Sequence, residues 1–208
     1  KKVEGGGGIK GVYWIPLGPT HTWRPFDIID KDISNRSNLF VFMDKVDTRY
    51  SGEMVDSLLH SENWHLLQHR GVVKSYQGTD NVWNQKILDP HHFVPIQRSL
   101  LYDSQYLPCP TGVHYETSRI WEALEAGTIP IIVGGNEHEM LADLDMGIVI
   151  LKSWSQLPDF LLSVSPQETK TRGDHVRGRY AAVKAALQRH LLSAVCQLKG
   201  QLSVGRVS

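Results

Sequence analysis

Three charged residues follow one another at three-residue intervals in the middle of the chain: Glu116, Arg119 and Glu122. On an α-helix, residues three apart lie on the same face, so these side chains would form one stripe. A guanidinium group binds phosphate oxygens with two parallel hydrogen bonds, and a carboxylate can accept hydrogen bonds from two sugar hydroxyls. The spacing is compatible with a nucleotide site, in which Arg119 binds a diphosphate and Glu122 a ribose. It is equally compatible with an exposed ladder of ion pairs that binds no ligand.

The residues on either side of this stripe predict the elements that would position it. A strand ends near residues 106–107, and a turn with Gly112 leads into a helix. Gly127 ends that helix with a left-handed cap, and Ile129–Val133 is β-branched like a parallel strand buried on both faces. Such a unit places a glycine loop and a helix N-terminus at the carboxyl edge of a parallel sheet. Open α/β folds bind their ligands at that edge.

Runs typical of strands and helices alternate along the rest of the chain. We expect further strands at 12–15, 39–43, 72–75 and 147–151, and helices beginning at Ser51, Pro95, Ser155 and Tyr180. This alternation predicts an α/β fold, with a Rossmann-like parallel sheet and helices on both faces. We expect a flexible glycine-rich leader at 1–10, the Rossmann-like domain at 11–170, and a C-terminal helix and tail at 171–208.

The composition of the chain limits the classes of function that it can have. The 208 residues are 41% hydrophobic and 21% charged, which suits one globular domain. A formal net charge of zero and a pI of about 7.3 argue against non-specific nucleic-acid binding, so we expect no nucleic-acid partner. No run is apolar for long enough to be a membrane helix, and the start at Lys1 without Met indicates a fragment. The two cysteines, Cys109 and Cys196, favour buried thiols over a disulfide framework.

Metal binding has weak support in the sequence. Asp143 and Asp145 have the Asp-x-Asp form with which metal-dependent GT-A glycosyltransferases bridge a diphosphate, although a three-residue match is a weak signal and a solvated turn is the favoured interpretation. The ten histidines do not come with the cysteine pairs or ligand spacing of a zinc site. We therefore expect no metal and no cofactor.

The central motif resembles the exostosin-like glycosyltransferases, a GT47-type family with the two-domain GT-B architecture. That family shows Cys-Pro and a glycine, then Arg-x-x-Glu-Ala, then Gly-x-Ile-Pro. The corresponding residues here are Cys109-Pro110, Gly112, Ser118-Arg119, Glu122-Ala123 and Gly127-Thr128-Ile129-Pro130. Within the family, the motif is most similar to the ribitol-xylosyltransferase branch. Weaker matches at Pro16-Leu17-Gly18 and 150–158 extend the resemblance from about residue 13 to 162.

The resemblance implies the C-terminal, donor-binding half of a GT-B fold, in an enzyme that inverts the configuration at the sugar. It implies that Glu122 binds the ribose and Arg119 the phosphates of a nucleotide-sugar donor, a UDP-sugar above all. Gly112, Glu116 and Ser118 complete the implied nucleotide site on the matching motif.

The sequence departs from the family pattern after the strand at 39–43, where residues 43–49 contain no glycine. Lys45 and Arg49 could still supply positive charge to a phosphate there. The implied partners are a glycan acceptor and an N-terminal acceptor domain, on which the catalytic base, unidentified here, would lie. The implied location is the lumenal face of the Golgi membrane. Two alternatives stay open: a non-catalytic nucleotide-sugar or glycan-binding module, and a metal-dependent GT-A-type transferase using Asp143 and Asp145.

Overall fold

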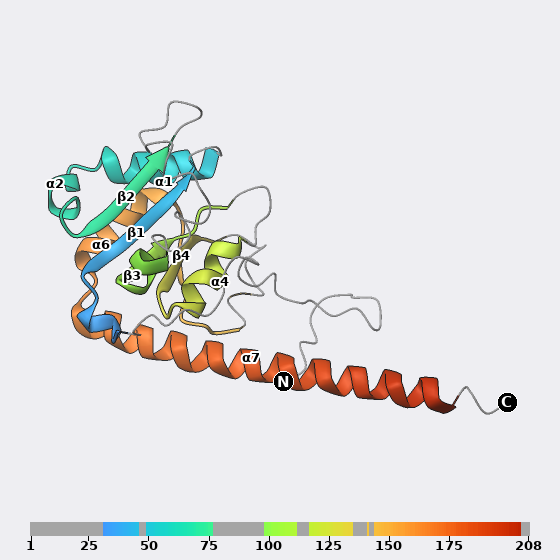
Figure 1. The fold of residues 1–208 in the computed structure, drawn as a ribbon. Coiled ribbons are helices and arrows are strands. Elements are labelled where there is room, and N and C mark those ends of the chain that lie inside the picture. The colour runs from blue at the N-terminus through green and yellow to red at the C-terminus, as the bar shows by residue number, and fades with distance from the viewer. Residues whose placement is uncertain are drawn as a thin grey trace.

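The computed structural model describes residues 31–45, 49–76, 98–111, 117–134, 141 and 144–204. Within these residues, five parallel strands form one sheet in the order β2-β1-β3-β4-β5 (Figure 1). The strands are β1 (Asn38–Lys45), β2 (Gly71–Tyr76), β3 (Ser104–Pro108), β4 (Ile129–Val133) and β5 (Val149–Leu151). An all-parallel sheet flanked by helices confirms the predicted α/β Rossmann-like fold.

Helices cover both faces of this sheet. The helices are η1 (Ile33–Asn35), α1 (Arg49–Leu59), α2 (Trp64–Leu67), α4 (Ser118–Glu125), η4 (Trp154–Gln156), α6 (Leu157–Ser163) and α7 (Pro166–Val204), with a helical turn at residues 98–102. The crossovers β1-α1-β2 and β3-α4-β4 run in opposite directions along the sheet. Because such crossovers are right-handed, α1 and α4 lie on opposite faces. α1, α2, η4 and α6 pack together, whereas α4 packs against β4 and α7.

The core explains why the central strands are apolar throughout. Leu39, Phe40, Val41 and Phe42 of β1 are successive residues and all are at most 6% exposed, so both faces of this strand are covered. Phe40 is paired in register with Gly71 of β2, and a Cβ on Gly71 would overlap the Phe40 ring. A glycine at the start of β2 therefore makes room for the largest side chain of β1.

The strand order places a topological switch point between β1 and β3. The chain leaves β1 toward β2 on one side and leaves β3 toward β4 on the other, so the loops after β1 and β3 diverge. Crevices for ligands in open α/β sheets form at such points, outside the carboxyl ends of the strands. Asn38 pairs with Ser104 and Phe40 with Tyr106, so β1 and β3 run side by side in the same direction. The segments that the sequence selected for phosphate binding therefore follow two adjacent strands.

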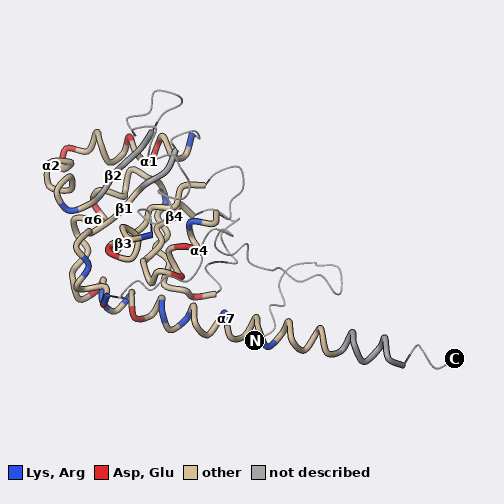
Figure 2. The backbone as a smooth tube through the Cα atoms, viewed as in Figure 1, with Lys and Arg blue, Asp and Glu red and all other residues tan. Residues whose placement is uncertain are grey.

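The long helix α7 lies across the opposite, amino edge of the sheet (Figure 1). It contacts residues that precede strands: Gly173 packs on Ile33 before β1, Arg177 lies beside Gly127 before β4, and Val176 packs on Gly147 before β5. Beyond this part, α7 extends away from the sheet, and Figure 2 shows few charges on that extension. Because α7 occupies the amino edge, the carboxyl edge is the side on which a ligand can bind.

Several sequence-based boundaries were wrong. The last helix begins at Pro166, not at Tyr180, so the expected boundary at 170 falls inside α7. The buried positions in the stretch before Tyr180 are Thr169, Gly173 and Val176, so only one of them is a large apolar residue and the sequence shows little apolar periodicity there. Likewise, α1 begins at Arg49, so Ser51 is a buried residue of its first turn and not its N-cap.

Other expectations had mixed outcomes. The four expected strands at 39–43, 72–75, 147–151 and Ile129–Val133 correspond to β1, β2, β5 and β4. Gly127 has the expected left-handed backbone, with φ of 64°. Cys109 is buried as expected, whereas Cys196 is exposed, contrary to the expectation of two buried thiols, and neither forms a disulfide in the structure. The leader at 1–10 and the strand at 12–15 lie outside the described residues. No helix among the described residues combines the length and the apolarity that a membrane span requires.

Candidate functional site

The start of α4 lies at the carboxyl edge of the sheet, directly after the loop that follows β3. Thr117 is the N-cap residue, and its hydroxyl oxygen accepts a hydrogen bond from the main-chain N–H of Arg119 (3.3 Å). Ser118, which belongs to the predicted site, is the first residue of the helix and is half-buried. The N-terminus of a helix carries partial positive charge, so this end of α4 favours an anion. Gly112 and Glu116, also predicted for the site, lie outside the described residues.

Arg119 and Glu122 form an ion pair on α4. Nη1 of Arg119 donates to Oε2 of Glu122 at 2.8 Å. The Arg119 side chain is 23% exposed, whereas the Glu122 side chain is only 2% exposed. This burial contradicts the exposed ladder of ion pairs that the spacing also allowed, at least for the pair that the structure describes. A carboxylate this deeply buried is costly unless a positive charge compensates it, and Arg119 supplies such a charge.

A second arginine of this region is more deeply buried. Arg98, in the helical turn that precedes β3, is 1% exposed. Burial lowers the pKa of Arg98 below its ordinary value, while the charges of Tyr102 and Glu122 act in the opposite direction. Since a guanidinium stays protonated in proteins, Arg98 is a buried cation in the turn before β3.

Lys45 and Arg49 lie at the same edge of the sheet. Lys45 is the last residue of β1, and Arg49 is the first residue of α1. The Arg49 side chain is 85% exposed and pairs with Glu53 at 2.7 Å, and this hydrogen bond raises the pKa of Arg49. Arg49 is therefore an exposed side chain at the rim of the switch point, held by a partner that an incoming phosphate would have to replace.

Of the two aspartates in the Asp-x-Asp segment, the structure describes Asp145. Asp143 lies outside the described residues, and Asp145 has a left-handed backbone with φ of 49°. The Asp145 carboxylate lies 3.3 Å from Nε2 of His175, and its main-chain oxygen accepts from the same nitrogen (2.8 Å) and from Arg179 (3.3 Å). These basic partners come from α7, at the amino edge. In the part of the chain that the structure describes, no cluster of His, Cys, Asp or Glu could hold a metal ion.

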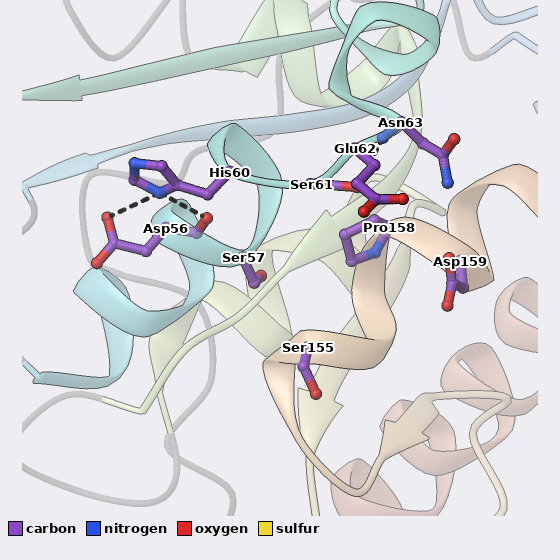
Figure 3. A pocket seen from close by; sticks show the side chains of 9 residues that line it. All are labelled: Asp56, Ser57, His60, Ser61, Glu62, Asn63, Ser155, Pro158 and Asp159. Atoms are coloured by element: carbon purple, nitrogen blue, oxygen red, sulfur yellow. Dashed lines mark hydrogen bonds and ion pairs between the residues drawn. The ribbon is translucent and has the colours of Figure 1, made fainter.

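A pocket of about 290 Å³ lies between the end of α1, the start of α2 and the segment from η4 to α6 (Figure 3). Three carboxylates line it, from Asp56, Glu62 and Asp159. His60 also lines it, and its Nδ1 lies 4.0 Å from Oδ1 of Asp56. All four side chains are exposed to water. The negative lining disfavours a nucleotide diphosphate, so this pocket does not compete with the start of α4 as an anion site.

Comparison with known proteins adds no family assignment. No protein-family model matches this chain, and no curated protein matches it significantly. The resemblance to exostosin-like glycosyltransferases therefore rests on the motif from Cys109 to Pro130 and on the two weaker matches outside it.

The sequence analysis did not identify two buried arginines: Arg98, in the turn before β3, and Arg36, at the amino edge of the sheet. Arg98 precedes the buried Leu101 by three residues, so the helical period places the two on one face. That spacing could have identified Arg98. Arg36 lies between two short polar residues just before β1, and no pattern in the sequence marks it as buried.

Proposed function

We propose that this chain is the donor-binding domain of an inverting glycosyltransferase, which transfers a sugar from a nucleotide diphosphate sugar to a glycan acceptor. The observation that carries the proposal is the partly buried pair of Arg119 and Glu122 at the start of α4, next to the switch point. The sequence motif around this pair supports it, because the resemblance to exostosin-like glycosyltransferases implies a UDP-sugar as donor, with UDP-xylose as the first to test.

The chemistry requires a stabilised leaving group. When the sugar departs, negative charge develops on the diphosphate, and the Arg119 guanidinium and the N-terminus of α4 would stabilise that charge. Glu122 would accept hydrogen bonds from the ribose hydroxyls and so fix the nucleotide. A general base must also remove the proton of the acceptor hydroxyl. We place that base on a separate acceptor-binding domain, in a protein of the Golgi lumen.

A second candidate is a non-catalytic module that binds nucleotide-sugars. It is favoured by residues 43–49, which join β1 to α1 without the glycine that the family pattern has there. A transfer assay with a panel of UDP-sugars separates the two candidates, because turnover excludes a module that only binds. Activity that survives EDTA would in turn exclude a metal-dependent transferase that uses Asp143 and Asp145.

Calorimetry with UDP tests the binding site itself. We expect Arg119→Ala to weaken UDP binding by about tenfold to a hundredfold, since a hydrogen bond to a charged group contributes about 1.5–3 kcal/mol. The matched control is Arg172→Ala on α7, which also removes a partly exposed arginine paired with one carboxylate (Glu168, 3.2 Å). We expect this control to bind UDP like the wild type.

The ribose contact has its own test. If Glu122 binds the ribose, the wild type should prefer UDP to 2′-deoxy-UDP, and Glu122→Gln should reduce that preference. Wild-type protein that binds neither nucleotide, or Arg119→Ala protein that binds UDP with unchanged affinity, would overturn the proposed site.

A further inference from the structure

The apolar face with which α7 packs on the sheet continues beyond the sheet. Val176, Tyr180 and Val183 follow one another at intervals of four and three residues, and all three belong to the core or pack against it. Leu187 and Leu191 continue this series at intervals of four, so they lie on the same face of the helix. The helix therefore carries one apolar stripe, whose first part packs on the protein's own domain.

The second part of the stripe lies on the projecting end of α7, residues 184–204, which we call the arm (Figure 1). Leu191 is 50% exposed, Leu192 66% and Val195 47%. Leu191 and Leu192 lie four and three residues before Val195, so the three side chains form one patch. Single exposed apolar residues are normal, whereas a contiguous patch that continues a packing face indicates a surface for another molecule.

The two ends of the chain carry opposite charge. Residues 175–208, which include the arm, contain six of the 22 Lys and Arg residues and none of the 22 Asp and Glu residues, a formal charge of +6 (6 − 0). Residues 1–174 then carry −6 (16 − 22). The described part of the domain has exposed carboxylates at Asp56, Glu62 and Asp159 (Figure 3). A basic, apolar arm fits an acidic surface, and this chain's own domain has the required sign.

The base of the arm already shows this kind of contact. Lys184, its first residue, donates to both carboxylate oxygens of Glu125 on α4 (3.0 and 2.9 Å), and its Nζ lies 4.7 Å from the centre of the Tyr180 ring. Within one chain, α7 thus packs on the domain through apolar side chains and a Lys–Glu pair. A second copy of the chain offers the same kind of surface to the part of the arm that its own domain does not reach.

The area available decides how two copies would meet. The arm is about 32 Å long and a helix is about 10 Å wide, so one side of it offers roughly 320 Å². Two arms packed on each other would bury about 640 Å² in total, which is below the roughly 1,200–2,000 Å² of stable specific interfaces. Two arms that each pack on the other copy's domain would bury about 1,280 Å². Pairing of two basic arms would also bring like charges together.

We propose that two copies of this chain form a dimer by exchanging arms, with the apolar stripe of each arm packed on the acidic domain of the other copy. A closed pair satisfies both arms at once, as the two-fold symmetry of most small oligomers does. Dimer formation is independent of the proposed nucleotide site, because α7 lies at the amino edge of the sheet and the start of α4 at the carboxyl edge.

Sedimentation velocity of the whole chain tests the dimer and its arrangement. Reducing buffer prevents a disulfide through the exposed Cys196. We expect a dimer at micromolar concentrations, and added NaCl should weaken it, because salt screens the attraction between opposite charges. Arms packed on each other join like charges, so salt would strengthen that dimer. A dimer that salt strengthens or leaves unchanged would overturn the exchange, and a chain that stays monomeric would overturn the interface.

A matched pair of variants tests the stripe. Leu191→Glu places a charge on it and should weaken the dimer by at least about tenfold. Ser193→Glu makes the same change of charge on nearly the opposite side of the helix, and it should leave the dimer close to wild type. Leu191→Ala, which favours a helix, should also weaken the dimer, so that the effect does not depend on unfolding of the arm. Equal dimerisation of the Leu191→Glu and Ser193→Glu variants would overturn the role of the stripe.

An anionic membrane is the other surface that a basic, apolar helix fits. Flotation with vesicles of phosphatidylcholine, with and without phosphatidylserine, separates it from a second copy. We expect the chain to stay a dimer and not to float with either kind of vesicle. A monomeric chain that floats only with the phosphatidylserine vesicles, and no longer floats as Leu191→Glu, would overturn the dimer and assign the arm to a lipid surface.

Discussion

Arginine side chains make different kinds of contact in two regions of this molecule. At the amino edge of the sheet, Arg36 is 4% exposed and donates to three oxygens at 2.7–2.8 Å: the main-chain oxygens of Ser104 and Ala126 and the hydroxyl of Thr128. On α4, Arg119 binds the carboxylate of the Glu122 side chain. The acceptors of Arg36 are neutral, and two of them are fixed in the backbone.

The difference separates a permanent joint from an exchangeable one. Arg36 connects the start of β3, the start of β4 and the end of α4, so its contacts break only if these elements separate. Its positive charge also suits the last carbonyl groups of α4. The Arg119–Glu122 pair joins two side chains on one helix, and it can open while every backbone element stays in place. The joint with more contacts therefore lies at the amino edge, and the pair that can open lies at the carboxyl edge, where we propose the nucleotide site.

The largest expected effect comes from breaking the amino-edge joint. Arg36→Met would remove a donor from three buried acceptors, of which the main-chain oxygen of Ser104 also accepts from Thr128 (3.3 Å), and we expect a loss of about 3–4 kcal/mol in the free energy of unfolding. Urea denaturation measures this loss. Arg36→Lys should recover only part of it, because one ammonium cannot reach acceptors on three elements. A loss below about 1 kcal/mol for Arg36→Met would show that Arg36 is not the joint that its contacts indicate.

Gly127, which adjoins the same joint, should give a smaller effect. Its φ is 64°, and a Cβ there would lie 2.7 Å from Nε of Arg177 and 3.3 Å from Nη2 of Arg36. We expect Gly127→Ala to cost about 1–2 kcal/mol from backbone strain, with a further cost if Arg36 has to shift. Gly178→Ala is a control, because a Cβ at Gly178 would meet nothing within 4 Å. Equal stability of the two variants in thermal unfolding would argue against a close fit at Gly127.

On the exchangeable side, stability and binding should respond differently. We expect Arg119→Met to lower the free energy of unfolding by no more than about 1 kcal/mol, because Arg119 is partly exposed. The same variant should lose at least about tenfold in UDP affinity. Parallel denaturation and calorimetry measure both quantities. A loss of several kcal/mol in stability would make this pair as permanent as Arg36 and would remove the contrast.

The smallest expected effect is a pH dependence at the amino edge. The Asp103 carboxylate is partly desolvated, but hydrogen bonds from Lys31 and Ser37 outweigh that effect and lower the pKa of Asp103 below 3.8. A lowered pKa stabilises the folded state above the ordinary Asp range, and this contribution is lost as the pH falls below 3.8. Asp103→Asn should therefore cost about 0.5 kcal/mol at pH 7, since its carboxylate is partly exposed, and nearly nothing near pH 2. Urea midpoints at the two pH values check this, and an equal loss at both would exclude a charge effect.

The sequence predicted the sheet more successfully than the long helix. β1 and β4 are continuous apolar runs, and a parallel strand buried on both faces requires that pattern. The first part of α7 instead packs through a glycine: Gly173 lets the helix approach Ile33 so closely that a Cβ would lie 2.7 Å from it. Glycine normally weakens a helix prediction, so the feature that permits this packing concealed the helix. The start of α7 did carry a signal, because Ser165, Pro166 and Glu168 match a capping box with proline at the first position.

For the candidate site, the sequence predicted residue types and spacing but not depth. The interval between Arg119 and Glu122 correctly indicated a shared face of a helix, and the structure pairs them. Spacing could not tell whether that face meets water or the rest of the protein. Burial is a property of the tertiary fold, so the distinction between an exposed ladder and a buried pair required the structure.

The projecting part of α7 has a practical consequence for measuring motion. From Val183, the last residue of α7 that packs on the core, to Val204 there are 21 residues (204 − 183), which span about 32 Å as an α-helix. A tilt of about 10° at Val183 would thus displace the far end by about 5 Å, so the helix acts as a lever arm. Cys196 lies on this arm with an exposed thiol, whereas Cys109 is buried. A thiol-reactive spectroscopic probe would label the natural protein on the arm and report small rotations of the sheet without an engineered site.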